Sequence, residues 1–576
     1  MQYTQLSKAY HEVEQTSKRL EKTRILAQTL QEAGEDMPRV ILLIQGRVRP
    51  AWQKETMGVS AKIMLKALAN VTGTNSKELE RAWSKSGDLG LVAEKHITNR
   101  SQETLFTQSL SVSYVHDQLK KLATISGERS QDTKLKIISE LLSHAQPIDA
   151  RYITRTILEQ LRIGIASGTV RDAIIYAFLA EQAGVEEGEI TDREAYNQVS
   201  QAVQSAYDKT NDFAEVAQAA KQGLEAINEI HIRVGTPIKV MLGYKGTTAT
   251  AAMNDLGKPL LLQYKYDGFR VEIHKEQDDI RIFTRRLEDV TKQFPDIVEA
   301  AKKNINAETC ILDAEAIGID TKNDRYLPFQ HVSQRIRRKH HIEEVAKRLP
   351  VDVRVFDILY LQGEELLNKP LSKRHELLEE TIQESKRFGI AQTLITNDEQ
   401  AGEDFFTKSL QAGAEGLFAK KIDSTYQPGT RVGNWIKIKD TMEPLDVVII
   451  GAEWGEGKRS GWLTSFDIAV RDEENNLLTI GKVATGLKEL QEEGFSFQEI
   501  TTLLQEHIEH EAGRHVSVQP KIILEVAYEE IQKSPSYESG YALRFPRILR
   551  NRTDEKDPED ITSLEYVEEL YEHQGI

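Results

Sequence analysis

The sequence predicts a multidomain protein with an all-α N-terminal domain, an α+β middle domain and a small β-barrel at the C-terminus. The chain has 576 residues, which is more than one hydrophobic core usually supports. Apolar residues recur at helical spacing as far as residue 229, whereas glycine, proline and short β-branched runs begin at residue 230. Several short strand-like segments separated by turns follow residue 439. The expected domains are therefore residues 1–229, 230–439 and 440–576.

The first domain is expected to be helical because its apolar residues follow the i, i+3, i+4 spacing of a buried helix face. One such set is Leu135, Ile137, Ile138, Leu141 and Leu142. Gly168 followed by Thr169 indicates a break between helices and a new N-cap, with the next helix over residues 170–183. No apolar stretch reaches the roughly 18 residues that a membrane-spanning helix needs.

A lysine in the middle domain stands beside a strong turn signal. Lys265 lies two residues before Asp267–Gly268, a dipeptide typical of tight β-hairpins. From Phe269 onwards apolar and polar residues alternate, as in a strand with one buried face. We expect the hairpin to leave Lys265 and Arg270 on strand ends that flank a tight turn. A lone lysine before Asp-Gly is most often an ordinary surface residue, so a functional interpretation needs further residues.

Carboxylates and lysines supply those further residues. Strand alternation puts Asp313 and Glu315 on one face, where a divalent cation between them would relieve their repulsion. Glu415 precedes another extended run. The same alternation puts Lys437 and Lys439 on one face, where a polyphosphate would balance their charge. Together these segments favour a site for a metal ion and a phosphorylated ligand.

Taken in order, the segments resemble the motifs of the covalent nucleotidyltransferase superfamily, and within it the ATP-dependent DNA ligases of archaea and eukaryotes. The matching segments are Lys265–Arg270, Thr284–Asp289, Leu312–Ala316, Val355–Leu361, Pro370–Arg374, Glu415–Leu417, Trp435–Lys439 and Leu543–Arg547. In the helical part, Leu161–Ala166 and Val170–Ile174 resemble the DNA-binding domain of these ligases. Two positions depart from the pattern: Gln263 stands where a glutamate is usual, and Val240 where a proline is frequent.

The resemblance implies a fold, an activity and partners. The fold would comprise an all-α DNA-binding domain, an α+β adenylation domain with antiparallel sheets and a C-terminal OB-fold β-barrel. The activity would be the sealing of nicks in double-stranded DNA during replication, repair and recombination, with ATP and Mg²⁺ or another divalent cation as cofactors. AMP would join Lys265, pass to the 5′-phosphate of the nick, and leave when the 3′-hydroxyl attacks. The protein would act as a monomer.

The resemblance also implies roles for individual residues. Phe356 would stack on the adenine, and Gln263 would hydrogen-bond to it. Further nucleotide-binding residues, near the ribose or the phosphates, would be Arg270, Arg285, Glu315, Arg431, Lys437 and Lys439. Glu315 and Glu415 would be metal ligands. In the C-terminal domain, Arg544 and Arg547 would orient the leaving pyrophosphate.

A short segment of the N-terminal domain, Gln102–Phe106, resembles the sliding-clamp-binding motif of archaeal ligases. By this resemblance Gln102 would hydrogen-bond to the clamp backbone, and Leu105 and Phe106 would fill an apolar pocket. The alternative is that both apolar side chains pack inward beneath the helices.

Composition excludes some classes of protein and leaves others open. The net charge of −16, from 74 basic and 90 acidic residues, argues mildly against nucleic-acid binding, although basic clusters such as residues 335–341 remain. The single cysteine, Cys310, excludes the four-cysteine zinc module of NAD⁺-dependent ligases and indicates a reducing, cytoplasmic setting. The open alternatives are an RNA ligase or mRNA-capping enzyme, and a catalytically inactive DNA-binding scaffold. The long helical domain argues against the former, and the retained Lys265 and Glu415 argue against the latter.

Overall fold

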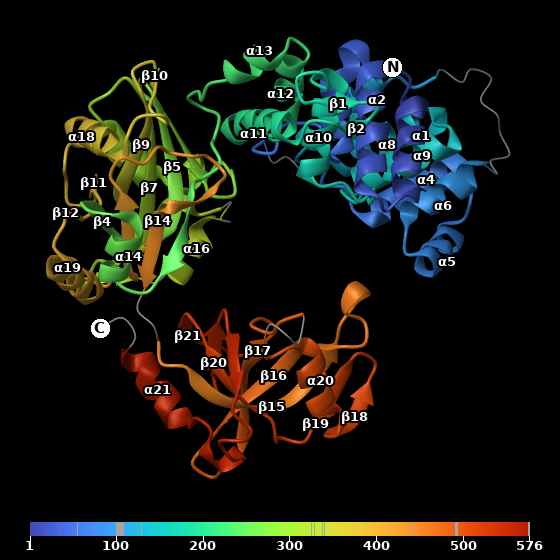
Figure 1. Cartoon of the computed structure of the whole chain (residues 1–576). Helices are drawn as coiled ribbons and strands as arrows, with labels where there is room; N and C mark the ends of the chain where they lie inside the picture. Colours follow the sequence, from blue (N-terminus) through green and yellow to red (C-terminus); the bar gives the residue numbers. More distant parts are fainter. Residues whose placement is uncertain are drawn as a thin grey trace. The chain divides into compact units, whose positions relative to one another are not determined.

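The computed structural model describes residues 1–53, 56–98, 109–127, 130–323, 325–327, 329–336, 338, 340–439, 442–489 and 494–573 (Figure 1). The chain passes from a helical region through a middle region of mixed strands and helices into a region rich in strands. This order confirms the predicted fold class: a helical N-terminal region, a middle region with antiparallel sheets, and a β-rich C-terminal region.

The N-terminal region is a set of packed helices with one small hairpin. Its elements are α1 (Tyr3–Gln15), α2 (Arg19–Glu32), α3 (Met37–Ile44), α4 (Ala61–Thr72), α5 (Ser76–Ser86), α6 (Leu89–Thr98), α7 (Val112–Thr124), α8 (Ser130–His144), α9 (Pro147–Ile157), α10 (Ser167–Phe178), β1 (Val185–Glu186), β2 (Glu189–Ile190), α11 (Arg193–Thr210), α12 (Phe213–Ala220) and α13 (Leu224–Asn228). The apolar faces of these helices share one buried core, which includes Ile138 and Leu141 of the helix predicted from spacing. Amphipathic periodicity therefore located α8 correctly.

The predicted bounds of α10 are wrong at both ends: the helix starts three residues earlier than predicted and ends at Phe178 rather than Ala183. The helix begins at Ser167 rather than Val170, and its N-cap is Ala166, whose side chain makes no capping hydrogen bond. Thr169 lies inside the first turn and is buried. The N-cap signal failed because the residue at the N-cap, Ala166, has no side chain that can cap the helix.

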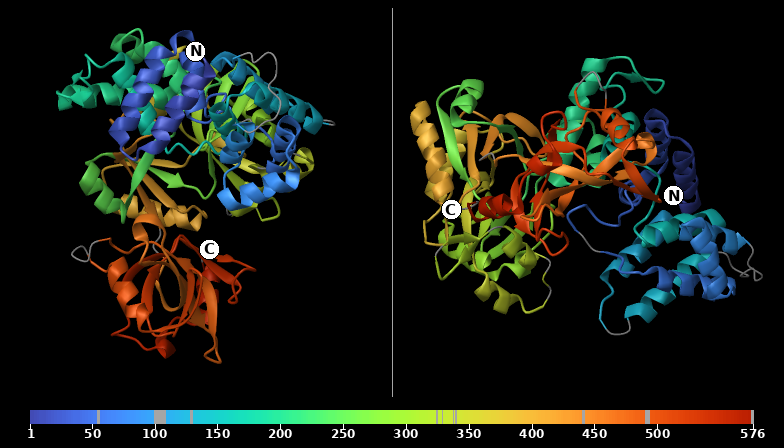
Figure 2. Two further views of the ribbon diagram at one scale, coloured as in Figure 1. Left: turned by 90° about the vertical axis from the view of Figure 1, so that its right-hand side faces the viewer. Right: turned by 90° about the horizontal axis from the view of Figure 1, so that it is seen from below.

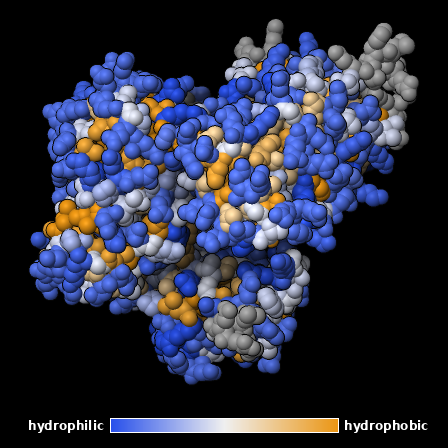
Figure 3. Space-filling view, turned by 45° about the horizontal axis from the view of Figure 1, so that its top comes forward, coloured by the Kyte–Doolittle hydropathy of each residue, from blue (hydrophilic) through white to orange (hydrophobic). Residues whose placement is uncertain are grey.

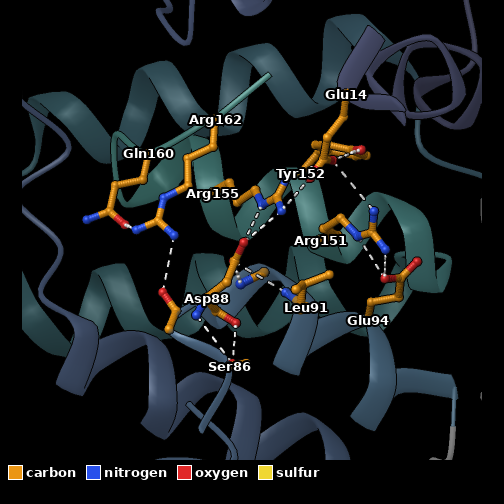
Figure 4. Close-up of polar contacts among 12 residues, drawn as sticks. Glu14, Ser86, Asp88, Leu91, Glu94, Arg151, Tyr152, Arg155, Gln160 and Arg162 are labelled. Carbon is orange, nitrogen blue, oxygen red and sulfur yellow. Dashed lines mark hydrogen bonds and ion pairs between the residues drawn. The ribbon is translucent and has the colours of Figure 1, made fainter. Parts of the chain in front are cut away.

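Buried ion pairs tie three segments of this region together (Figure 4). The guanidinium group of Arg155 on α9 donates to Glu14 of α1 at 2.9 Å and to Asp88, just before α6, at 2.7 Å. Tyr152 also donates to Glu14, at 2.7 Å. Each charge of this network has a hydrogen-bonded partner of opposite sign, which is the condition for burying it.

The middle region contains two sheets. The seven-stranded sheet has the order β10-β9-β7-β5-β6, with β11 and β8 added beside β9 and β7. Its strands are antiparallel except for the parallel pair β11 and β9. Its elements are β5 (Phe269–Glu276), β6 (Asp279–Thr284), α15 (Pro295–Asn304), β7 (Thr309–Asp320), β8 (Arg325–Leu327), α16 (Phe329–Ile336), α17 (Ile342–Arg348), β9 (Val351–Leu361), β10 (Glu364–Glu365), α18 (Leu371–Thr381) and β11 (Phe388–Ile390).

The second sheet has five strands in the order β12-β4-β13-β14-β3. Its elements, with two helices, are β3 (Leu242–Gly246), α14 (Ala249–Leu256), β4 (Leu260–Lys265), β12 (Thr393–Thr396), α19 (Glu399–Gln411), β13 (Gly416–Lys421) and β14 (Arg431–Lys439). The predicted hairpin between Lys265 and Arg270 is wrong, because β4 and β5 belong to different sheets. Gly268 is needed for close packing: a Cβ atom there would lie 2.5 Å from the carbonyl oxygen of Ala316 on β7.

The C-terminal region is built on a seven-stranded sheet of order β17-β16-β15-β19-β18, in which β20 pairs with both β15 and β23. Its elements are β15 (Leu445–Trp454), β16 (Leu463–Arg471), β17 (Leu477–Val483), α20 (Phe497–Gln505), β18 (Ile508–Ala512), β19 (His515–Val518), β20 (Ile523–Ala527), β21 (Glu530–Lys533), β22 (Tyr541–Arg544), β23 (Arg547–Asn551) and α21 (Leu564–His573). The strands curve around a core of aliphatic side chains (Figure 2).

The face shown in Figure 3 is mostly hydrophilic, and its apolar residues gather in separate patches. Within the described ranges, no helix combines the length and the apolar character needed to cross a membrane. Among exposed large apolar residues, Phe545 between β22 and β23 is 68% exposed and has a left-handed backbone conformation, with φ of 50°.

Candidate active site

Lys265 is the last residue of β4, and its side chain is bound by Glu415. Glu415 stands immediately before β13, the strand next to β4, and its backbone N–H donates to the carbonyl oxygen of Lys265 at 2.7 Å. The ammonium group of Lys439, on β14, lies 2.7 Å from the same carboxylate. One carboxylate therefore lies between two lysines carried by β4 and β14, the strands on either side of β13.

The charge of Glu415 is fixed by these lysines. Burial alone would raise the pKa of Glu415, but the ammonium groups of Lys265 and Lys439 lower it to about 2. Burial acts to lower the pKa of Lys439, and Glu415 more than reverses this, so the pKa is raised. The sequence predicted a phosphate as the anion facing Lys439. In the structure the carboxylate of Glu415 faces Lys439. The same carboxylate pairs with Lys265, 150 residues away along the chain, which no local pattern indicates.

Gln263 lies on β4 two residues before Lys265 and is buried. It faces Thr393 of β12 in the register of the sheet, and its amide nitrogen donates to the Thr393 hydroxyl at 3.1 Å. The neighbouring strand thus orients the amide of this residue.

A second group of polar residues surrounds Arg270 on β5. Its guanidinium forms a two-point pair with Asp313 of β7, with Nε 2.8 Å from Oδ1. The hydroxyl of Tyr426 donates to Asp313 at 2.8 Å and accepts a hydrogen bond from Arg270 at 3.0 Å. The cation that pairs with Asp313 in the structure is therefore the guanidinium of Arg270. Glu315, the other carboxylate of that prediction, faces Arg270 in the register of β5 and β7.

Phe356 of β9 lies against two cations. The guanidinium carbon of Arg270 is 5.2 Å from the centre of its ring, and the ammonium nitrogen of Lys420 is 4.8 Å from it. Lys420, on β13, also lies 4.1 Å from the centre of the Trp435 ring. The sequence analysis did not identify Lys420 or Tyr426 as site residues, although Lys420 lies only five residues after Glu415.

Lys420 gives a pH-dependent prediction. Burial lowers its pKa from 10.5 to about 7, although the charge of Asp357 opposes the shift. Between about pH 7 and 10.5 the unfolded chain binds a proton that the folded chain lacks. The free energy of unfolding should therefore rise with pH across this window, by at most about 1.4 kcal/mol per pH unit. Urea denaturation at several pH values should show this rise in the parent and a flatter profile in Lys420→Met. Identical profiles would contradict the assignment.

The remaining predicted site residues lie at exposed or differently paired positions. Arg285 is exposed in the turn after β6, and Arg431 is exposed at the start of β14. Lys437 is half-buried on β14, between Trp435 and Lys439 in the alternation of the strand. In the C-terminal region, Arg544 pairs with Glu530 at 2.7 Å, while Arg547 is exposed at the start of β23. The predicted clamp residues Gln102, Leu105 and Phe106 lie outside the described residues.

A divalent metal ion fits this donor set only as a partner of a bound nucleotide. In the part of the chain that the structure describes, no three His, Cys, Asp or Glu side chains are grouped so that they could hold a metal ion. Mg²⁺ in phosphoryl-transfer sites is usually held by one or two carboxylates together with substrate phosphates. Glu415, ionised at neutral pH, and Glu315 can each supply a carboxylate of this kind.

Comparison with known proteins defines the class to which this fold and site belong. The family model for the ATP dependent DNA ligase domain matches residues 240–439, which contain all the middle-region residues described above. The model for the DNA ligase N terminus matches residues 2–175, and that for the ATP dependent DNA ligase C terminal region matches residues 459–555. The protein is thus an ATP-using ligase.

Full-length relatives identify the family. The DNA ligase of Nanoarchaeum equitans is 41% identical and that of Thermococcus onnurineus 38% identical, and each alignment covers 100% of this chain and at least 98% of the relative. The solved structure of Pmar-Lig_PreS3 matches 95% of this chain and 99% of its own, with a TM-score of 0.52 and 15% identity, which shows likeness of fold. The chain belongs to the ATP-dependent DNA ligase family, and it uses ATP and a divalent metal ion such as Mg²⁺ to seal nicks in DNA.

Proposed function

We propose that Lys265 is the residue that carries AMP during nick sealing. The observation behind this proposal is that a half-buried, ionised carboxylate, Glu415, binds the Lys265 amine at the end of β4. The neutral amine is the nucleophilic form, and Glu415 stabilises the ammonium form. Nucleotide binding must therefore loosen this pair before Lys265 can attack.

In the proposed mechanism, nick sealing proceeds in three steps. The amine of Lys265 loses a proton and attacks the α-phosphorus of ATP, so that a P–N bond forms and pyrophosphate leaves. An oxygen of the 5′-phosphate at the nick then attacks the same phosphorus, the P–N bond breaks, and Lys265 regains a proton. Finally the 3′-hydroxyl attacks the 5′-phosphate, a phosphodiester bond forms and AMP leaves. When bound with the nucleotide, Mg²⁺ would neutralise charge at the phosphates, and Glu315 and Glu415 would each offer it a carboxylate.

The other motif residues are assigned to the nucleotide. Phe356 stacks on the adenine and Gln263 hydrogen-bonds to it, with its amide oriented by Thr393. The ribose and phosphates are contacted by Arg270, Glu315, Arg285, Arg431, Lys437 and Lys439. Arg270 is suited to this role because Asp313 and Tyr426 hold its guanidinium in place.

The proposal is tested by following labelled nucleotide. The parent protein is incubated with ATP labelled at the α-phosphate, or with labelled NAD⁺ or GTP, and nicked duplex DNA is then added. ATP should label the protein most efficiently, and the label should leave the protein as the nick is sealed. Labelling from NAD⁺, or a label that remains on the protein when DNA is added, would contradict the proposal.

We further propose that the protein acts as a monomer on double-stranded DNA in the cytoplasm, with domains at residues 1–229, 230–439 and 440–576. The helical domain would hold the duplex through its phosphates, using backbone N–H groups at helix N-termini such as that of α10, without reading bases.

Arg547 is expected to act mainly in the first step. As an exposed residue at the start of β23 it is available to orient the leaving pyrophosphate, and loss of such a donor usually slows a reaction roughly 10²-fold. Arg547→Ala should therefore slow self-adenylation by about this factor and slow sealing of a pre-adenylated nick far less. Arg550→Ala, on the same strand and paired with Glu525, is the matched control. Equal losses in both steps would indicate a role in folding or DNA contact instead.

Gln102, Leu105 and Phe106 are proposed to bind a sliding clamp. Phe106→Ala should leave the sealing of a short nicked duplex unchanged and remove stimulation by the cognate clamp, with a rise in the clamp Kd of about tenfold or more. Thr104→Ala is the control within the same segment. Clamp binding that survives Phe106→Ala, or loss of folding of the helical domain, would show that these side chains pack inward.

A further inference from the structure

The segment that joins the helical region to the middle region has no regular secondary structure, yet it is bound along its length. It comprises residues 230–241, between the end of α13 and the start of β3, and is called the linker below. Three side chains on one face of β5 contact its backbone. His274 accepts a hydrogen bond from the N–H of Gly235 at 3.0 Å, and Glu272 accepts one from the N–H of Ile238 at 2.9 Å. Arg270 donates to the carbonyl oxygen of Met241 at 2.7 Å.

The spacing of these contacts is regular. Residues 270, 272 and 274 alternate with apolar residues on β5, so their side chains share one face of the strand. Their partners follow in reverse order at three-residue intervals, which means that the linker runs antiparallel to β5. These side chains thus satisfy backbone groups of the linker that would otherwise need partners in a neighbouring strand.

The protonation of the contact residues suits this arrangement. Burial lowers the pKa of His274 to about 3, so its imidazole is neutral. The backbone N–H of Gly235 can only donate, so Nδ1 is the acceptor and Nε2 carries the proton, which it donates to Glu272 at 3.2 Å. Burial, followed by the charge of Asp313, raises the pKa of Glu272 well above its usual value. Both side chains are almost fully buried, and both hydrogen-bond to the linker.

The opposite side of the linker is bound to the helical region. Asn211, which caps α11, donates to the carbonyl oxygen of Pro237 at 2.7 Å. Asp208 of the same helix accepts from the ammonium of Lys239 at 2.7 Å, and its carbonyl oxygen accepts from the backbone N–H of Lys239 at 3.0 Å. The linker is therefore hydrogen-bonded to the end of α11 and to the strand that carries Arg270.

We propose that Glu272 and His274 are positioning residues that clasp the linker to β5 and so tie the DNA-binding helical region to the strand of the nucleotide motif. The inference goes beyond the assignment of Lys265 and does not depend on it. Self-adenylation needs no DNA, whereas sealing a nick needs the helical and catalytic regions on one duplex. A fixed tether raises the effective concentration of one region near the other, so the clasp serves the DNA-dependent steps.

The test compares variants that remove the hydrogen bonds with variants that keep them. Glu272→Leu and His274→Leu remove the acceptors. Glu272→Gln keeps a carbonyl oxygen for Ile238, and His274→Asn keeps one for Gly235. Glu276→Leu, at the exposed end of the same strand, is the matched control. Hydrogen exchange of the Gly235 and Ile238 amides is measured on the full chain, together with self-adenylation and with the KM and kcat for sealing a pre-adenylated nick.

The leucine variants should exchange these amides roughly tenfold faster or more and raise the KM for the pre-adenylated nick, with self-adenylation within about twofold of the parent. The glutamine and asparagine variants should restore most of both properties. Unchanged amide exchange in the leucine variants would overturn the clasp, and equal losses in self-adenylation and sealing would overturn its positioning role. If Glu272→Leu does not fold, the two His274 variants provide the same comparison at Gly235.

Discussion

Lys265→Ala is expected to abolish formation of the covalent enzyme–AMP intermediate while leaving the sealing of a nick that already carries 5′-AMP. Alanine has no nucleophile, so the step in which the P–N bond forms should fall by roughly 10⁴-fold or more. The later attack by the 3′-hydroxyl does not use the amine as a nucleophile. Labelled ATP followed by denaturing gel electrophoresis measures the first step, and a synthetic 5′-adenylated nick measures the last.

The control for this prediction is Lys258→Ala, which removes another lysine shortly before β4 that pairs with Glu399 on the surface. It should form enzyme–AMP at the parent rate. Mass spectrometry of the adenylated parent should find AMP on Lys265 alone. Detection of AMP on a different lysine, or full labelling of Lys265→Ala, would refute the assignment.

In the proposed mechanism, Glu415 explains why the reactivity of Lys265 depends on the bound nucleotide. Its carboxylate is shared between Lys265 and Lys439, so the site without nucleotide is a cluster of one acidic and two basic groups. A polyphosphate adds negative charge that can pair with Lys439 in place of Glu415. A divalent ion adds positive charge that can pair with Glu415 in place of Lys265. Both changes weaken the ion pair between Glu415 and Lys265, so that binding of the nucleotide frees the amine that would attack it.

The fold was predictable wherever it follows from periodicity within one segment. The helical region, the strands around Lys265 and the β-rich C-terminal region were all expected from spacing and composition. The start of α10 was not, because Ala166 offers no capping side chain to signal it. The hairpin at Asp267–Gly268 failed for a different reason: Gly268 is there for close approach to Ala316, and a turn signal alone does not say which strands will pair.

The partners of the site residues were beyond what a single sequence can give. Strand alternation correctly put Asp313 and Glu315 on one face of β7, but the choice of Arg270 and Tyr426 as partners for Asp313 depends on the order of strands in the sheet. The pairing of Lys265 with Glu415 depends in the same way on β4 lying next to β13. Local patterns identify charged positions, whereas tertiary structure decides which charges meet.

The largest effect on stability is expected at a buried ion pair beneath Phe356. Asp357 on β9 and Arg374 on α18 are both fully buried. The guanidinium donates two hydrogen bonds to the carboxylate, from Nε to Oδ1 at 2.7 Å and from Nη2 to Oδ2 at 3.0 Å. Arg374 also donates to the carbonyl oxygens of Lys369 and Ser424. Asp357→Leu would leave the arginine buried without its counter-charge, which should lower the free energy of unfolding of the middle region by about 3–5 kcal/mol.

A double variant separates the burial of an unpaired charge from the intrinsic contribution of the pair. Asp357→Leu combined with Arg374→Met replaces both charges with apolar groups, and it should be less destabilised than Asp357→Leu alone, because no uncompensated charge remains. Hydrogen exchange of the β9 amides during urea denaturation is the suitable measurement, because a chain of several domains does not unfold in one transition. A loss below about 1 kcal/mol in Asp357→Leu, or a double variant as unstable as the sum of the single ones, would show that the pair does not act as a unit. The expected recovery would instead show that what the fold requires at this position is charge balance.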